Sequence, residues 1–148
     1  MIQNAPISDI LNQKGSAVWS ISPQATVFEA IQLMADKNVG ALLVTDADKL
    51  VGVISERDYT RNIILKGKSS KQTAVKEIIS GKVIHVSPAH TVEDCLRLMT
   101  DHRIRHLPVL EADRVVGVIS IGDLVNWIIS AQTSTIHQLQ TYIGGYPS

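Results

Sequence analysis

The stretch Gly52–Asp58 (GVISERD) returns 65 residues later as Gly117–Asp123 (GVISIGD). The similarity extends backwards without a gap, so that Ile21–Asp58 aligns with Val86–Asp123. A weaker similarity precedes each copy: Ile7–Leu11 resembles Val75–Ile79, with a three-residue change in spacing. Self-similarity at a fixed period is typical of repeat architectures. The chain is therefore two copies of a unit of about 60 residues.

Each copy predicts the same order of elements: strand, helix, strand, strand, helix. The first strand, Val18–Ile21 or Val83–Val86, ends at a Ser-Pro pair, since proline has no N–H and restricts the residue before it. A helix begins after Thr26 or Thr91, with Glu29 completing a capping box that Asp94 imitates more weakly. Two strands joined by a hairpin turn follow, Ala41–Thr45 with Leu50–Ile54 and His106–Leu110 with Val115–Ile119. The last helix begins at Ser55 or Glu56, and at Ser120 or Ile121.

These elements predict an α/β (α+β) fold of two β-α-β-β-α repeats packed with pseudo-twofold symmetry, because one repeat alone is too small to bury its sheet well. Repeat 1 is expected at 7–66 and repeat 2 at 75–132, with a polar linker at 67–74. In the C-terminal tail, 133–148, the apolar residues Ile136, Leu139 and Tyr142–Ile143 can extend a helix before Gly144 breaks it.

Composition narrows the class of protein. The 148 residues carry 14 Lys+Arg and 14 Asp+Glu, and this net charge of zero argues against a nucleic acid as the main partner. No apolar run approaches the length of a membrane span, and Met1–Ile10 lacks the pattern of a signal peptide. A single cysteine excludes a disulfide framework and fits a reducing compartment, so we expect a cytoplasmic protein.

The repeated Gly-x-x-Ser-x-x-Asp motif is the candidate ligand-binding site. It lies where a strand ends and a helix begins, a place where unpaired N–H groups suit an anion such as phosphate. The Ser hydroxyl can donate to a phosphate oxygen, and the Asp carboxylate can accept two hydrogen bonds from vicinal ribose hydroxyls. The alternative is that Ser55 and Ser120 only cap their helices, with Asp58 and Asp123 favoured in the first turn.

The tandem unit, its Ser-Pro and the doubled motif resemble a pair of cystathionine-β-synthase (CBS) domains, a Bateman module, over roughly Ile7 to Ile129. Ser55–Tyr59, Arg61 and Leu65–Gly67 further resemble small stand-alone bacterial CBS-pair proteins. The resemblance implies that an adenine nucleotide binds in two clefts between the paired sheets. It assigns to the first site Val18, Trp19, Val39, Gly40, Ala41, Val53, Ser55, Arg57, Asp58, Arg105 and His106. It assigns to the second site Ser16, Val83, Ile84, Ile104, Val118, Ser120 and Asp123.

The resemblance also implies that the two clefts differ in charge. In this family the residues before the second strand of one repeat often supply cations to the ligand that the other repeat anchors. Repeat 2 has Arg103, Arg105 and His106 there, so the Asp58 cleft is expected to bind phosphate through Arg105 and His106. The Asp123 cleft meets only Gly40 and Ala41, and is expected to take a neutral tail, a dinucleotide whose second half lies elsewhere, or nothing.

Other candidate sites have weaker support. His102 and His106 have metal-ligand spacing but straddle a helix end, so no metal site is expected. Cys95 lies on the predicted apolar helix face and is interpreted as a packing residue. With no nucleophile beside a base and no paired carboxylates, we expect no catalytic residues and no catalytic cofactor.

The sequence therefore predicts a regulatory sensor, not an enzyme. The resemblance implies that its ligand is AMP, ADP, ATP or NAD(H), whose binding changes the conformation of the pair in the manner of an energy sensor. A homodimer is expected, since family members usually dimerise through their helices. The output must lie in an unknown effector protein in trans, with neither nucleic acid nor membrane as partner. The alternative is a ligand-free dimerisation scaffold.

Overall fold

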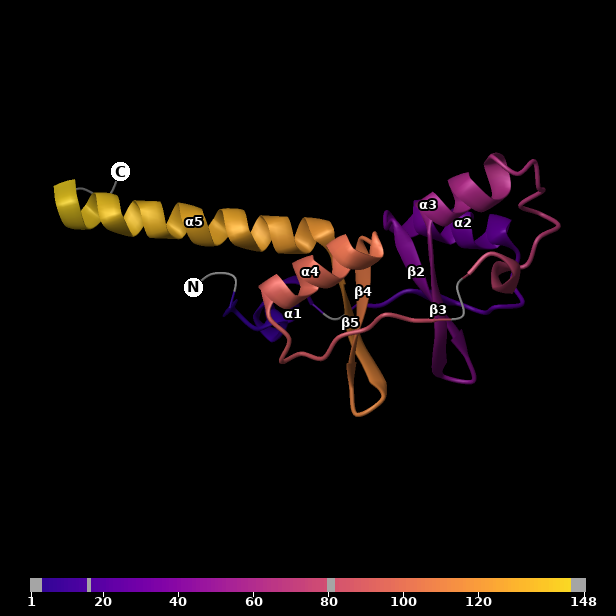
Figure 1. Cartoon of the computed structure of the whole chain (residues 1–148), viewed down its shortest axis with the longest axis horizontal. Coiled ribbons are helices and arrows are strands. Elements are labelled where there is room, and N and C mark those ends of the chain that lie inside the picture. Colours follow the sequence, from indigo (N-terminus) through magenta and orange to yellow (C-terminus); the bar gives the residue numbers. More distant parts are fainter. Residues whose placement is uncertain (1–3, 16, 80–81, 145–148) are drawn as a thin grey trace. The chain divides into compact units, whose positions relative to one another are not determined.

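The computed structural model describes residues 4–15, 17–79 and 82–144. They form two compact units: residues 1–16 and 85–148 belong to unit 1, and residues 17–84 to unit 2. Figure 1 shows the elements of both, and each unit contains a strand hairpin with helices beside it. The mixture of helices and strands confirms the predicted α+β class.

Unit 2 is a three-stranded sheet with helices. Its elements are β1 (Ser20–Ile21), α2 (Val27–Lys37), β2 (Ala41–Asp46), β3 (Lys49–Ser55), α3 (Glu56–Tyr59), a π-helical turn (Thr60–Ile64) and a 3₁₀ turn (Val75–Glu77). Strand β1 pairs parallel to β2, and β2 pairs antiparallel to β3. The hairpin turns at Ala47 and Asp48, whose φ angles of 49° and 65° are those of a type I′ turn that matches the strand twist.

Unit 1 repeats this plan with one strand fewer. Its elements are α1 (Ile7–Lys14), α4 (Val92–His102), β4 (His106–Glu111), β5 (Arg114–Ser120) and α5 (Ile121–Gly144). The hairpin turn again has positive φ at Ala112 and Asp113. The predicted tail thus begins as a continuation of α5 up to Gly144, and the helix extends well past the other elements of its unit (Figure 1).

The structure corrects the prediction of a strand at Val83–Val86. Only Val86 pairs, through a single parallel bridge to Val109. In unit 2 the Leu43 N–H donates to the Trp19 carbonyl oxygen at 3.0 Å, whereas the residue that aligns with Leu43 is Pro108, which has no N–H to donate. The first strand of repeat 2 therefore shrinks to one residue.

The two predicted capping boxes, at Thr26 and at Thr91, are not equally complete, and their order is the reverse of the expected one. Thr91 and Asp94 form the complete capping box, in which each backbone N–H is bonded by the other residue's side chain. Thr26 accepts from the Glu29 N–H, but the Glu29 carboxylate does not return the bond. The pair predicted to be the weaker imitation is thus the more complete one.

Each unit is completed by the first segment of the other repeat. Helix α1 joins repeat 2, where the Ile7 N–H donates to the His90 carbonyl oxygen at 2.8 Å. The 3₁₀ turn at Val75 joins repeat 1, where the Val75 N–H donates to the Ala25 carbonyl oxygen at 2.8 Å. The predicted linker 67–74 consequently lies inside unit 2, with Thr73 buried and its hydroxyl bonded to the Ser69 carbonyl oxygen. The chain passes between the units after residues 16 and 84 instead.

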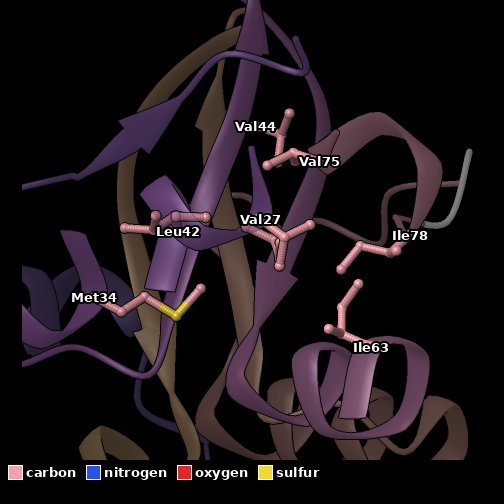
Figure 2. Close-up of a cluster of buried hydrophobic side chains, with 9 residues drawn as sticks. Val27, Met34, Leu42, Val44, Ile63, Val75 and Ile78 are labelled. Atoms are coloured by element: carbon pink, nitrogen blue, oxygen red, sulfur yellow. The ribbon is translucent and has the colours of Figure 1, made fainter. Parts of the chain in front are cut away.

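The exchanged segments contribute to both cores. In unit 2, Val75 and Ile78 pack in one apolar cluster with residues of α2, the sheet and the π-helical turn (Figure 2); its members are Val27, Ala30, Met34, Leu42, Val44, Ile54, Ile63, Val75 and Ile78. In unit 1, Ile7 and Ile10 of α1 are buried, as is Cys95, which confirms its interpretation as a packing residue. No helix among the described residues has the length and apolar character to cross a membrane.

Candidate functional site

Both Ser-x-x-Asp motifs form capping boxes at the junction of a strand and a helix. In unit 2 the Ser55 N–H donates to Asp58 Oδ2 at 2.9 Å, and the Asp58 N–H donates to Ser55 Oγ at 3.3 Å. In unit 1 the Ser120 N–H donates to Asp123 Oδ2 at 2.8 Å, and the Asp123 N–H donates to Ser120 Oγ at 3.1 Å. The capping role that the sequence left open is therefore real in both repeats.

Capping does not use the whole carboxylate. Every hydrogen bond that Asp58 and Asp123 accept through their side chains from described residues ends on Oδ2. Neither Oδ1 atom accepts a hydrogen bond from the described residues, and both belong to half-buried carboxylates that the caps hold in a fixed orientation. A carboxylate so placed can accept hydrogen bonds from a hydroxyl-bearing ligand.

In unit 2 the start of β2 lies beside the motif. Ala41 pairs with Ser55 across the hairpin, and the Gly40 carbonyl oxygen accepts from the Glu56 N–H at 3.1 Å. Val53 lies two residues before Ser55 on the same strand. The structure therefore brings Gly40, Ala41, Val53, Ser55 and Asp58 together at one end of the β2–β3 hairpin.

The other residues assigned to the first site are divided between the two units. Trp19 is 40% exposed and has the Lys37 ammonium 4.4 Å from its ring centroid. Val18, Val39 and Arg57 are each half-buried within unit 2. Arg105 and His106 belong to unit 1.

In unit 1 the corresponding neighbours gather at the second motif. His106 pairs with Ser120, and the Arg105 carbonyl oxygen accepts from the Ile121 N–H at 2.9 Å, as Gly40 does in unit 2. Val118 precedes Ser120 on β5, and Ile104 lies just before β4. Of the remaining residues assigned to the second site, Val83 and Ile84 fall in unit 2, and Ser16 lies outside the described residues.

Lys14 is the residue that sequence reasoning missed. Its ammonium lies 2.6 Å from Asp123 Oδ2 and 2.8 Å from the Val118 carbonyl oxygen. Burial raises the pKa of Asp123, but the hydrogen bonds from Lys14 and Ser120 outweigh burial and hold that pKa below its usual value. The weak similarity between Ile7–Leu11 and Val75–Ile79 was the available signal that residues near Lys14 belong to the repeat.

The carboxylate of the first motif differs in this respect. Among the described residues Asp58 forms no ion pair. The two motifs share their caps and differ in the charge next to the carboxylate.

Cys95 and the two histidines His102 and His106 are the other reactive groups singled out from the sequence. Burial raises the pKa of the Cys95 thiol to about 12, which removes it as a nucleophile near neutral pH. His102 ends α4 and His106 begins β4, with Arg103 at φ 55° between them. Within the described residues no group of three or more His, Cys, Asp or Glu side chains is placed to hold a metal ion.

Comparison with known proteins matches residues 7–65 and 75–130 to the family described as the CBS domain. The chain is 39% identical over 155 residues to the mitochondrial CBS domain-containing protein CBSX3 of Arabidopsis thaliana, covering 97% of this chain and 75% of that protein. It is 33% identical over 138 residues to the CBS domain-containing protein YhcV of Bacillus subtilis, covering 89% and 98%. A solved structure of a CBS-domain protein from Burkholderia ambifaria is similar with a TM-score of 0.83 and 44% identity, covering 86% of this chain and 96% of that one.

Proposed function

The chain belongs to the CBS-domain family, with two CBS domains in tandem, and from this premise we propose that it is a regulatory module that binds an adenine nucleotide and acts on a partner protein in trans. CBS-pair proteins are generally regulatory, ligand-binding modules and not catalysts. The observation that carries the proposal is the open Oδ1 on a half-buried, cap-oriented aspartate in both repeats.

Ribose recognition follows from the geometry of these carboxylates. The capping box holds Asp58 through Oδ2, so the carboxylate is already oriented before a ligand arrives. A 2′,3′-diol can then donate to the acceptor capacity that remains. Because the group is half-buried, these charge-assisted bonds are stronger than they would be in open solvent.

The ligand class is AMP, ADP, ATP or NAD(H). The bound nucleotide favours one conformation of the chain through contacts that the other conformation lacks, and the partner distinguishes the two. In this proposal Arg105 and His106 contact phosphate, as the sequence predicts, and the protein acts in the cytoplasm.

Self-association is part of the proposal. Val125, Ile129 and Leu139 of α5 are 43%, 55% and 54% exposed, a large apolar content for a helix face in water. A homodimer that covers such residues is expected, and light scattering at several concentrations measures it. Dimers without any nucleotide effect would favour the ligand-free scaffold.

The test is a calorimetric panel of AMP, ADP, ATP and NADH together with the 2′-deoxy form of whichever ligand binds. Asp58→Asn keeps an acceptor for the Ser55 N–H while removing the charge, so it isolates recognition from folding. It is expected to reduce the preference for ribose over 2′-deoxyribose, whereas Asp36→Asn, an exposed carboxylate on α2, leaves it unchanged.

A thermal shift provides the first check. A nucleotide at 100 times its dissociation constant stabilises the folded chain by about 2.7 kcal/mol. If no adenine nucleotide shifts the unfolding temperature, the proposal fails. Turnover of ATP or NADH that is lost in Asp58→Asn would instead make the protein an enzyme.

A further inference from the structure

The Lys14 side chain is anchored at the second motif by two acceptors. Its ammonium donates to Asp123 Oδ2 at 2.6 Å and to the Val118 carbonyl oxygen at 2.8 Å. The carboxylate side chain is 21% exposed and that of Lys14 is 34% exposed. The cation therefore lies at the edge of the motif, where solvent or a ligand can reach it.

The ion pair changes what the Asp123 motif offers to a ligand. Asp123 Oδ2 already accepts from Lys14 and from the Ser120 N–H, so only Oδ1 remains for a hydroxyl. The ammonium also offsets the carboxylate charge, which weakens the attraction of the carboxylate for a neutral sugar. At Asp58 the Ser55 N–H and hydroxyl likewise bond to Oδ2, but no cation among the described residues offsets the carboxylate charge.

We propose that Lys14 is a specificity-determining residue that makes the Asp123 motif select phosphorylated nucleosides over uncharged ones. This inference rests on the proposed function and names the ligand class for one of its two motifs. A nucleoside brings only hydroxyl groups to a carboxylate that Lys14 has partly neutralised. A nucleotide brings an anion as well, which the long and partly exposed lysine side chain can bind while the ribose bonds to Asp123.

The proposal reverses an expectation from the sequence. The sequence places only Gly40 and Ala41 opposite Asp123, so that a neutral tail, a dinucleotide whose second half lies elsewhere, or no ligand is expected there. The structure supplies a cation from α1, a segment within the same compact unit.

The test compares AMP with adenosine by calorimetry in the full chain carrying Asp58→Asn, so that the second motif dominates binding. Two substitutions at Lys14 are matched: Lys14→Met keeps the length of the side chain and removes the charge, and Lys14→Arg keeps the charge. Both residues are good helix formers, so α1 persists in each variant. Far-ultraviolet circular dichroism and the unfolding temperature check that it does.

Lys14→Met is expected to lower the ratio of AMP affinity to adenosine affinity about fivefold, the upper end for a partly exposed charge pair. Lys14→Arg is expected to keep the ratio within about twofold of the parent. As a second readout, carbon-13 NMR of the Asp123 carboxyl is expected to show a higher pKa in Lys14→Met, because an opposite charge is lost.

Three results would overturn the inference. If Lys14→Met tightens AMP and adenosine equally, Lys14 blocks the motif without selecting a ligand. If Lys14→Met changes neither affinity, Lys14 does not contact the anion. In both cases nucleotide binding itself persists, so the proposed function survives. Failure of every form, including the chain with Asp58 and Lys14 intact, to bind either compound overturns both proposals.

Discussion

Substitution of Ile7 by Ala tests which repeat α1 stabilises. The Ile7 side chain is 0% exposed, and the Ile7 N–H donates to His90 in unit 1. Truncating a buried isoleucine to alanine costs about 3 kcal/mol, the sum of lost transfer free energy and the cavity left behind. At about 1.4 kcal/mol per factor of ten, the opening equilibrium of the affected unit rises by about two orders of magnitude.

Native-state hydrogen exchange measures this opening one amide at a time. In Ile7→Ala we expect exchange about 100-fold faster in β4 and β5, with β2 and β3 little changed, although β2 and β3 are nearer to Ile7 in the sequence than β4 and β5 are. Val75→Ala is the matched control at the aligned position and is expected to give the mirror result. Faster exchange in β2 and β3 than in β4 and β5 for Ile7→Ala, or an equal effect on all four strands, would refute the assignment of α1 to unit 1.

Three further predictions concern local contacts. Gly117→Ala places a Cβ 2.6 Å from Leu11 Cδ2 and is expected to lower the free energy of unfolding by about 1 kcal/mol. In a double-mutant cycle measured by urea unfolding, most of this loss should disappear when Leu11→Ala is also present, whereas additive effects of the two substitutions would contradict the contact. Because the pKa of Cys95 is raised to about 12, the native thiol should react with Ellman's reagent at pH 8 far more slowly than in denaturant, and equal rates would show that it is accessible. Hydrogen bonds from Thr91 lower the pKa of Asp94 below its usual value of 3.8 in the folded state. Asp94→Asn should therefore destabilise the fold above pH 3.8, and the destabilisation should shrink as the pH falls below that value. A destabilisation that does not depend on pH would argue against the bond.

Local patterns predicted the elements well. The Ser-Pro pairs, the Thr caps and the apolar periodicity of Val27–Met34 depend on neighbours in the sequence, and the structure has helices and hairpins where these patterns put them. Both Ser-x-x-Asp motifs stand where a strand meets a helix, as predicted. Such features follow from the backbone of a few consecutive residues.

Long-range features could not be read in the same way. Lys14 and Asp123 are 109 positions apart, and nothing in the neighbourhood of either residue indicates the other. The shortened strand before Ser87 depends on the N–H that Pro108 lacks, a residue that belongs to a different element. A capping box is complete only when the carboxylate accepts from the N–H of the capping threonine. The shorter Asp94 accepts this bond from Thr91, whereas Glu29 does not accept it from Thr26.

The placement of α1 with repeat 2 bears on how a chain of this kind can be divided or can have arisen. A cut near residue 70 would give two fragments, each with one full copy of Gly-x-x-Ser-x-x-Asp, yet each fragment would carry the finishing segment of the other's core. Neither half should fold alone, and the two mixed together should restore both cores. An ancestral single copy would have met the same need by trading its first segment with an identical chain, as domain-swapped dimers do. Gene duplication would then have turned an exchange between molecules into one within a single polypeptide.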